Sequence, residues 1–103
     1  MDVTNSAQGL VEELTELIEA QDFEGGEELL LRALGLVEQG SPYQAFLNFQ
    51  MGKVYTRWDK LTSALNHLNL AAEQAFASRD EFFLLQIQEE LRLVKDRQFR
   101  QRP

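Results

Sequence analysis

Residues 51–71 read MGKVYTRWDKLTSALNHLNLA, and the order of small and large residues in this stretch indicates how the chain folds. Gly52 has no side chain and would let a second helix approach the first closely. Tyr55 lies three residues later, on the same helix face, and would fill the groove between the two helices. Ala64 and Ala71 are small where the second helix would cross the first. The stretch therefore predicts two packed antiparallel helices.

Capping residues and apolar spacing divide the whole chain into five predicted helices. Ser41 can cap a helix, Pro42 fits its first turn, and Gln44 completes a capping box. No segment alternates with the period of a strand, so we expect no sheet. Short connections make consecutive helices antiparallel neighbours. The predicted helices cover about residues 6–20, 23–38, 42–57, 60–77 and 80–97, with N-caps at Asn5 or Ser6, Asp22, Ser41, Asp59 and Ser78, and with Gly40 ending the second helix.

The stretch has a weaker copy nearer the N-terminus. At an offset of 38 residues, the matching pairs are Leu17 for Tyr55, Gly26 for Ala64, Leu30 for Leu68 and Ala33 for Ala71. Leu14 departs from the repeat, because it stands where the second copy has Gly52. The surplus residues between Ala33 and Pro42 predict a second helix about one turn longer than usual.

Over roughly residues 7–98 the chain resembles the tetratricopeptide repeat (TPR) family. The residues that carry the resemblance are Gly52, Tyr55, Ala64, Leu68 and Ala71. The resemblance implies an all-α fold of five antiparallel helices, stacked as two TPR-like helical hairpins plus a C-terminal capping helix. Asn48 departs from the family pattern, because a large apolar residue is usual at its position. The alternative is a plain helical bundle that meets these spacings by chance.

The 103 residues fit one domain, which we place at residues 1–98, followed by a basic tail at residues 99–103. The chain has no cysteine, no stretch that resembles a signal peptide, and no apolar run long enough for membrane insertion. We therefore expect a cytoplasmic protein without disulfides.

The net charge of −7 is unevenly distributed: residues 1–40 carry −9 and residues 93–103 carry +3. The plainest interpretation is a solvated acidic face and a basic end. The alternatives are electrostatic steering of a partner or head-to-tail contact between two copies. An acidic body argues against nucleic acid as a partner, because binding phosphates needs a basic surface.

In TPR proteins the first helix of each hairpin lines a concave groove, and the resemblance implies the same for this chain. The groove positions would be Gln8, Val11, Thr15 and Ile18 on the first helix and Phe46, Phe49, Lys53 and Arg57 on the third. Phe46 and Phe49 are not needed by the inward stripe of their helix, so they suggest an interaction site. The alternative is that they pack beneath the fifth helix.

The fifth helix poses the same question, because residues 82–85 are four consecutive large apolar residues. Leu84 belongs to an inward stripe with Ile87, Leu91 and Val94. Phe82 and Leu85, with Phe83 as a further candidate, are then surplus, and a helix apolar on several sides is usually buried on more than one. We expect them either to border the groove or to form a homodimer interface.

The sequence offers no constellation for catalysis, so we expect no enzyme, no cofactor and no metal site. His67 is the one histidine and has no cysteine to share a metal with. The Gly25–Gly26 pair is a turn rather than a phosphate-binding loop, because no Lys-Ser/Thr follows it. Trp58 is expected to plug the edge of the core, or else to lie at the end of the groove.

These patterns favour a non-enzymatic protein–protein interaction module: an adaptor, a chaperone or an assembly factor. The clamp with which some TPR proteins bind acidic C-termini of chaperones is absent, because Val11, Thr15 and Gln50 occupy its places. An apolar groove suits an apolar or amphipathic segment of another protein instead. The alternative is an obligate homo-oligomeric structural protein that assembles through its C-terminal helix.

Overall fold

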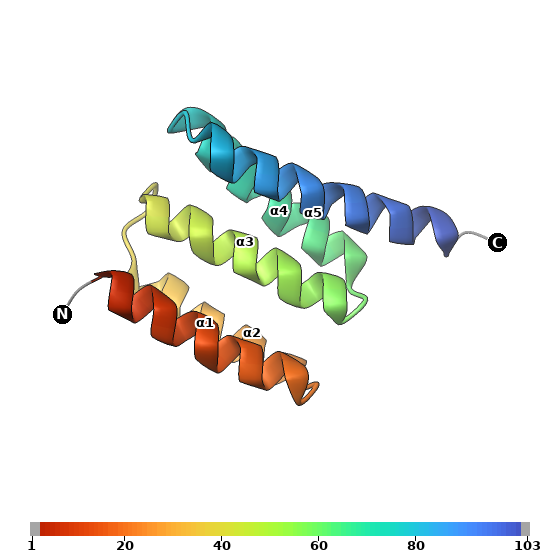
Figure 1. Ribbon diagram of the computed structural model, residues 1–103, viewed down its shortest axis with the longest axis horizontal. Helices are drawn as coiled ribbons and strands as arrows, with labels where there is room; N and C mark the ends of the chain where they lie inside the picture. Colours follow the sequence, from red (N-terminus) through yellow and green to blue (C-terminus); the bar gives the residue numbers. More distant parts are fainter. Residues whose placement is uncertain (1–2, 102–103) are drawn as a thin grey trace.

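The computed structural model describes residues 3–101, and this part of the chain is helical apart from its short turns (Figure 1). Its helices are α1 (Val3–Glu19), α2 (Phe23–Leu36), α3 (Pro42–Arg57), α4 (Leu61–Ala77) and α5 (Glu81–Arg100). Figure 1 shows α1, α3 and α5 in a front layer, with α2 and α4 behind them. The predicted all-α fold of consecutive helical hairpins is confirmed.

Two predicted N-caps are confirmed at the starts of α2 and α3. The Asp22 carboxylate accepts a hydrogen bond from the N–H of Gly25 at 3.0 Å, and the Ser41 hydroxyl accepts one from the N–H of Gln44 at 3.2 Å. The Gln44 side chain does not complete the predicted box with Ser41. It reaches one residue further and accepts the N–H of Gly40 at 2.6 Å.

The predicted caps of the first and fourth helices are wrong. α1 already begins at Val3, so Asn5 and Ser6 lie inside it. Asp59 precedes the N-cap of α4 by one residue and adopts a left-handed φ of 63°, which turns its side chain away from the helix start. Its carboxylate instead accepts a hydrogen bond from Gln101 at 2.7 Å.

The ends of α5 also differ from the prediction. Asp80, not Ser78, is the N-cap, and its carboxylate accepts the N–H of Phe83 at 3.1 Å. Ser78 is instead the C-cap of α4, and its hydroxyl donates back to the carbonyl of Ala75 on α4 at 3.2 Å. The helix continues to Arg100, so residues 99 and 100 are helical where we predicted a tail.

The second helix is not longer than usual, contrary to the prediction. It ends at Leu36, and Val37 is already extended, with φ −102° and ψ 153°. Gly35 lowers the helical preference of the last turn, and Val37 gains more by packing against the core from the extended conformation. The surplus residues form the turn at 37–41, where Gly40 supplies a left-handed φ of 82°.

The predicted close approach at Gly52 is confirmed. A Cβ atom at this position would lie 2.5 Å from both Cγ and Cδ2 of Leu68, so α4 packs directly on the backbone of α3. Leu68, Ala64 and Ala71 have no exposed surface. The largest fully buried side chains of the core are Leu30, Leu47, Met51, Val54, Leu68, Ile87 and Val94.

Asn48, the departure from the family pattern, belongs to a polar network inside the α3–α4 hairpin. It is 3% exposed, and its side-chain amide donates to Oε1 of Gln74 at 3.4 Å. The Gln74 amide donates in turn to Oε1 of Gln44 at 2.9 Å, the same atom that accepts the Gly40 N–H. The network satisfies polar groups that burial would otherwise penalise.

An aromatic cluster joins the two hairpins at the turn between α3 and α4. The Tyr55 hydroxyl donates a hydrogen bond to the Glu27 carboxylate on α2. Trp58 stacks on Phe23 and on Tyr55, with centroid distances of 5.9 and 6.2 Å, and the Lys60 ammonium lies 3.6 Å from its ring centroid. Trp58 therefore plugs the core edge beside α2, and the groove-end alternative is excluded.

Gly52→Ala should destabilise the protein, because the new methyl group overlaps the Leu68 side chain. We expect a loss of about 1–3 kcal/mol in the free energy of unfolding, measured by urea denaturation followed by circular dichroism. Gly35→Ala is the matched control, since nothing lies within 4 Å of its Cβ position. In the control, alanine should stabilise α2 by about 0.5–1 kcal/mol. Equal effects of the two substitutions would contradict the close approach.

The hydroxyl of Tyr55 should lose its proton at a higher pH than an ordinary tyrosine does. Burial, followed by the hydrogen bond and the negative charge of Glu27, raises the pKa of Tyr55 from 10.0 to about 12. As the pH rises, the Tyr55 hydroxyl loses its proton in the unfolded chain before it does so in the folded protein. The stability that the neutral, hydrogen-bonded hydroxyl contributes is therefore complete below pH 10 and is lost as the pH rises towards 12. The loss should reach at most about 3 kcal/mol.

Ultraviolet absorbance titration of the Tyr43→Phe variant would follow Tyr55 alone, since the chain has 2 tyrosines. Adding Glu27→Gln to this variant should lower the pKa of Tyr55. A pKa near 10.0 before that addition would show that the bond to Glu27 does not form.

Candidate functional site

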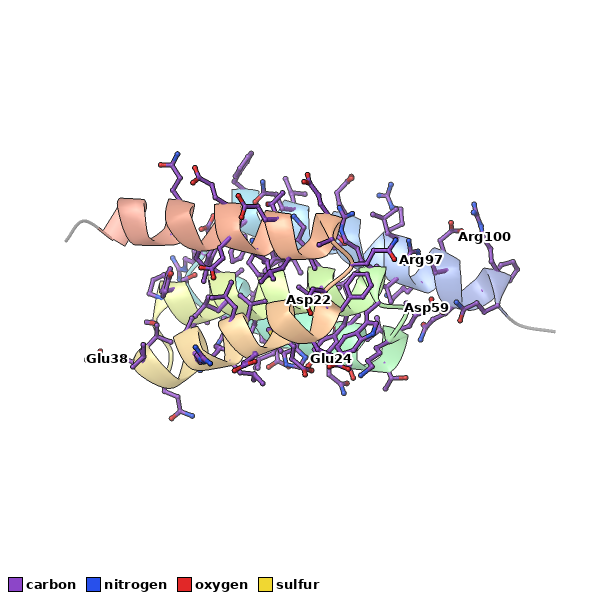
Figure 2. All side chains as sticks on the ribbon, turned by 90° about the horizontal axis from the view of Figure 1, so that it is seen from below. Asp22, Glu24, Glu38, Asp59, Arg97 and Arg100 are labelled. Atoms are coloured by element: carbon purple, nitrogen blue, oxygen red, sulfur yellow. The ribbon has the colours of Figure 1, made fainter. Side chains whose placement is uncertain are left out.

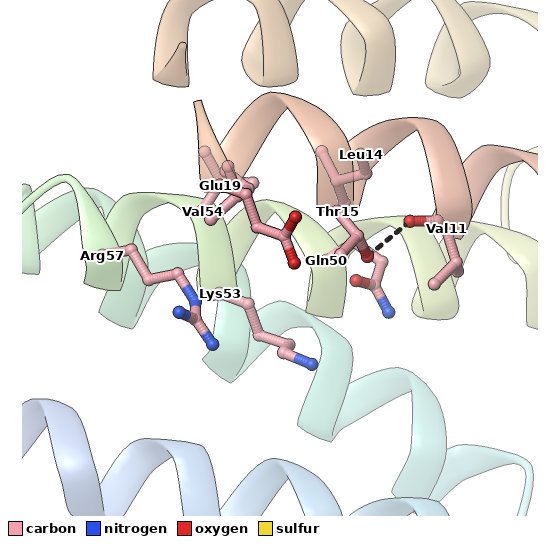
Figure 3. Close-up of a pocket in the computed structure, with 9 residues that line it drawn as sticks. Val11, Leu14, Thr15, Glu19, Gln50, Lys53, Val54 and Arg57 are labelled. Carbon is pink, nitrogen blue, oxygen red and sulfur yellow. Dashed lines mark hydrogen bonds between the residues drawn. The ribbon is translucent and has the colours of Figure 1, made fainter. Parts of the chain in front are cut away.

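A cleft of about 220 Å³ separates α1 from α3 on the front layer (Figure 3). The apolar side chains of its floor are Val11, Leu14, Ile18 and Val54, and the polar side chains at its edges are Thr15, Glu19, Gln50, Lys53 and Arg57. We call it the first cleft.

Helical periodicity brings the α1 residues of the first cleft to one face. Val11, Thr15 and Ile18 follow one another at intervals of four and three residues, and the Thr15 hydroxyl donates to the carbonyl of Val11 at 2.7 Å. Leu14, 5% exposed, is the one buried side chain among residues 7–19. Leu10 and Ile18 are half-buried against the core beside Leu14, while Val11 and Thr15 in the cleft stay exposed.

A second cleft, of about 310 Å³, separates α3 from α5. Lys53 and Arg57 line both clefts, so α3 forms the wall between them. Arg97 on the far wall donates a hydrogen bond to the carbonyl of Thr56, which fixes α5 beside the end of α3. The remaining lining residues are Glu90, Leu93, Asp96 and Arg100.

The cations of the two clefts are incompletely neutralised. Arg100 pairs with Asp96 at 3.1 Å on the same helix. Lys53, Arg57 and Arg97, by contrast, form no ion pair with any of residues 3–101.

Part of the acidic residues of the N-terminal half lies away from the clefts, whereas Glu19 lines the first cleft. Figure 2 shows Asp22, Glu24 and Glu38 on α2 and its flanking turns, while Arg97 and Arg100 project from the C-terminal end of α5. The two clefts thus present Lys53, Arg57 and Arg97 without ion pairs among the described residues, beside the carboxylates of Glu19 and Glu90.

The structure brings most of the predicted groove residues together. Val11, Ile18, Lys53 and Arg57 all line the first cleft, as does Thr15. Gln8 is exposed on α1 but lies outside the cleft lining. The first cleft therefore lies between the first and third helices and contains five of the eight predicted groove residues.

Phe49 and Phe46 do not lie in the groove, and their prediction as surface groove residues is corrected. Phe49 is 8% exposed and packs edge-on against Phe83 of α5, with ring centroids 5.4 Å apart. Phe46 is half-buried and stacks on Tyr43 at 5.6 Å. The alternative, packing beneath the fifth helix, holds for Phe49, because α5 crosses α3 closely enough to cover its ring.

The inward stripe of the fifth helix is confirmed. Ile87 and Val94 have no exposed surface, and Leu84 and Leu91 are half-buried against the core. Of the surplus side chains, Phe83 is half-buried on Phe49, whereas Phe82 is 73% and Leu85 61% exposed.

Arg97, Arg100 and Leu93 were missed as cleft residues. Leu93 and Arg97 lay inside the predicted fifth helix, but nothing in the sequence showed that they face α3, and Arg100 lay beyond the predicted end of that helix. The charge of +3 over residues 93–103 was the available signal. It pointed to this surface once the helix was extended through Arg100.

Residues 3–101 include one histidine, His67. No group of three or more His, Cys, Asp or Glu side chains there is arranged to hold a metal ion. His67 is half-buried, with Nδ1 3.0 Å from the Ser63 carbonyl oxygen and its ring against Tyr55. Among the described helices, none has both the length and the apolar character that crossing a membrane requires.

Comparison of the chain with protein-family models, with curated proteins and with solved structures finds no match. The resemblance to the TPR family therefore depends on the residues and their packing alone.

Phe49→Ala should destabilise the domain by about 3–5 kcal/mol, because it leaves a cavity beneath α5. Phe82→Ala is the matched control, and its effect should stay within about 0.5 kcal/mol, because its ring is 73% exposed. Thermal and urea unfolding of both variants would check this. A stable Phe49→Ala variant would return Phe49 to the candidate binding surface.

Proposed function

We propose that the protein is a non-enzymatic protein–protein interaction module, an adaptor or assembly factor of TPR-like architecture. It holds an amphipathic segment of a partner protein against the front layer formed by α1, α3 and α5. The observation that carries this proposal is the first cleft, an apolar floor bordered by cations without ion pairs.

The size of the first cleft favours a partner segment over a small molecule. At about 220 Å³ it is smaller than the roughly 300–1,000 Å³ of typical small-molecule sites. It suits one or two apolar side chains anchored from a helix, with the rest of the helix resting on the rim. Val11 and Ile18 from α1 and Val54 from α3 would contact these anchors.

The charges favour acidic residues next to the anchors. Lys53 and Arg57 stand at the edge of the apolar floor and also face the second cleft, where Arg97 lies opposite. Carboxylates on the partner would pair with these cations, which steers association and selects the partner's orientation. Glu19 on the opposite edge would disfavour a second acidic stripe on the α1 side.

We place this activity in the cytoplasm. The absence of cysteine from the sequence is compatible with a reducing compartment.

The test is a titration with a synthetic amphipathic peptide that carries leucines at helical spacing and glutamates beside them. Binding followed by amide chemical shifts should perturb Val11, Ile18 and Lys53. A peptide with lysines in place of the glutamates should bind at least about tenfold more weakly. Shifts confined to α2 and α4, or none for either peptide, would contradict the proposal.

Arg57→Glu should weaken binding of the acidic peptide by roughly tenfold, because it places a carboxylate against the peptide's own. Arg32→Glu makes the same change of charge on exposed α2, away from both clefts. Its effect should be less than about threefold. Equal losses for the two variants would indicate a response to net charge and not a site.

A further inference from the structure

The outer face of α5 lacks a covering element. In both hairpins the first helix is backed by a second, α1 by α2 and α3 by α4, but α5 has no successor within residues 3–101. Its large apolar side chains remain accessible: Phe82 is 73%, Leu85 61%, Leu93 54% and Phe99 73% exposed. We call this surface the outer face of α5, and exposed apolar surface of this kind marks an interaction site.

The charges along α5 are divided between its two halves. The first half carries Glu81, Glu89 and Glu90, and the second carries Arg92, Lys95, Arg97 and Arg100 with Asp96 as the exception. The helix dipole accounts for opposite charges in the first and last turns. It does not account for Glu89 and Arg92, which are exposed near the middle and form no ion pair with any described residue.

Two pairs of residues on the outer face are arranged symmetrically about the middle of the helix, whereas Leu85 and Leu93 have Asp96 and Gln88 at the mirrored positions. Phe82 and Phe99 are equally far from the point between residues 90 and 91, and so are Glu89 and Arg92. A second α5 laid antiparallel on the first therefore places each Phe82 opposite Phe99 of the other copy. It also places each Glu89 opposite Arg92 of the other copy, twice over by symmetry.

We propose that a second copy of this chain covers the outer face, in a two-fold symmetric dimer built on an antiparallel α5–α5 pair. The aromatic pairs lie at the two ends, and the Glu89–Arg92 ion pairs near the axis fix the register. A parallel pairing would bring like charges together in each half. The dimer leaves the first cleft open, because no residue of α5 lines it.

The dimer should be weak and reversible. A helix of 20 residues is about 30 Å long, and one such pair buries less surface than the roughly 1,200–2,000 Å² of stable interfaces. We therefore expect a dissociation constant in the micromolar range. This differs from an obligate oligomer, whose subunits do not fold alone.

Sedimentation velocity over a concentration series tests the pairing. The wild-type chain should shift reversibly from monomer to dimer across the micromolar range. Glu89→Arg and Arg92→Glu should each raise the dissociation constant at least about tenfold, because each creates two like-charge contacts. The double variant E89R/R92E restores opposite charges and should return to within about threefold of wild type.

Arg32→Glu, on exposed α2, controls for net charge and should leave the dissociation constant unchanged. Circular dichroism should show every variant folded, because Glu89 and Arg92 contribute no buried contact. A wild-type chain that stays monomeric overturns the dimer. A double variant as weak as the single ones overturns the antiparallel register. Neither result affects peptide binding at the first cleft, so the proposed function is tested separately.

Discussion

Leu68 rests directly on the backbone of Gly52, and the positions of the other helices follow from that contact. The absence of a side chain lets α3 and α4 approach closely enough to bury Ala64 and Ala71 completely. The same hairpin then offers α2 the Tyr55 hydroxyl on one side and offers α5 the ring of Phe49 on the other. Both clefts of the front layer share α3 as a wall, so their shape depends on how this helix is seated.

Packing at small residues was predictable from the sequence because its cause is local and steric. Gly52, Ala64 and Ala71 are small, which suits a position where a second helix packs closely. Asp22 and Ser41 cap backbone N–H groups three residues away, within a single helical turn. Asp59 could not be judged in this way. Its role depends on Gln101, 42 residues away, and on a backbone conformation that side-chain identity does not reveal.

The candidate site was predictable in part, for a related reason. Val11 and Ile18, which the TPR resemblance suggested as groove residues, do line the first cleft. Phe49 could not be placed in this way, because whether a third helix covers it is set by the angle at which α5 crosses α3. The end of α5 was equally hidden, since a run of charged residues is compatible with either a helix or a solvated tail until Arg97 is seen bonded to Thr56.

α1 is the wall of the first cleft, yet Leu14 is the one buried anchor among its residues 7–19. A helix held so lightly should open locally at a small cost in free energy, well below that of global unfolding. A partner segment that binds against α1 must then also hold α1 in its packed position. The entropy lost in ordering α1 reduces the net binding free energy. The affinity of the cleft would thus be adjustable from outside it, through substitutions that change only how firmly α1 is seated on α2 and α3.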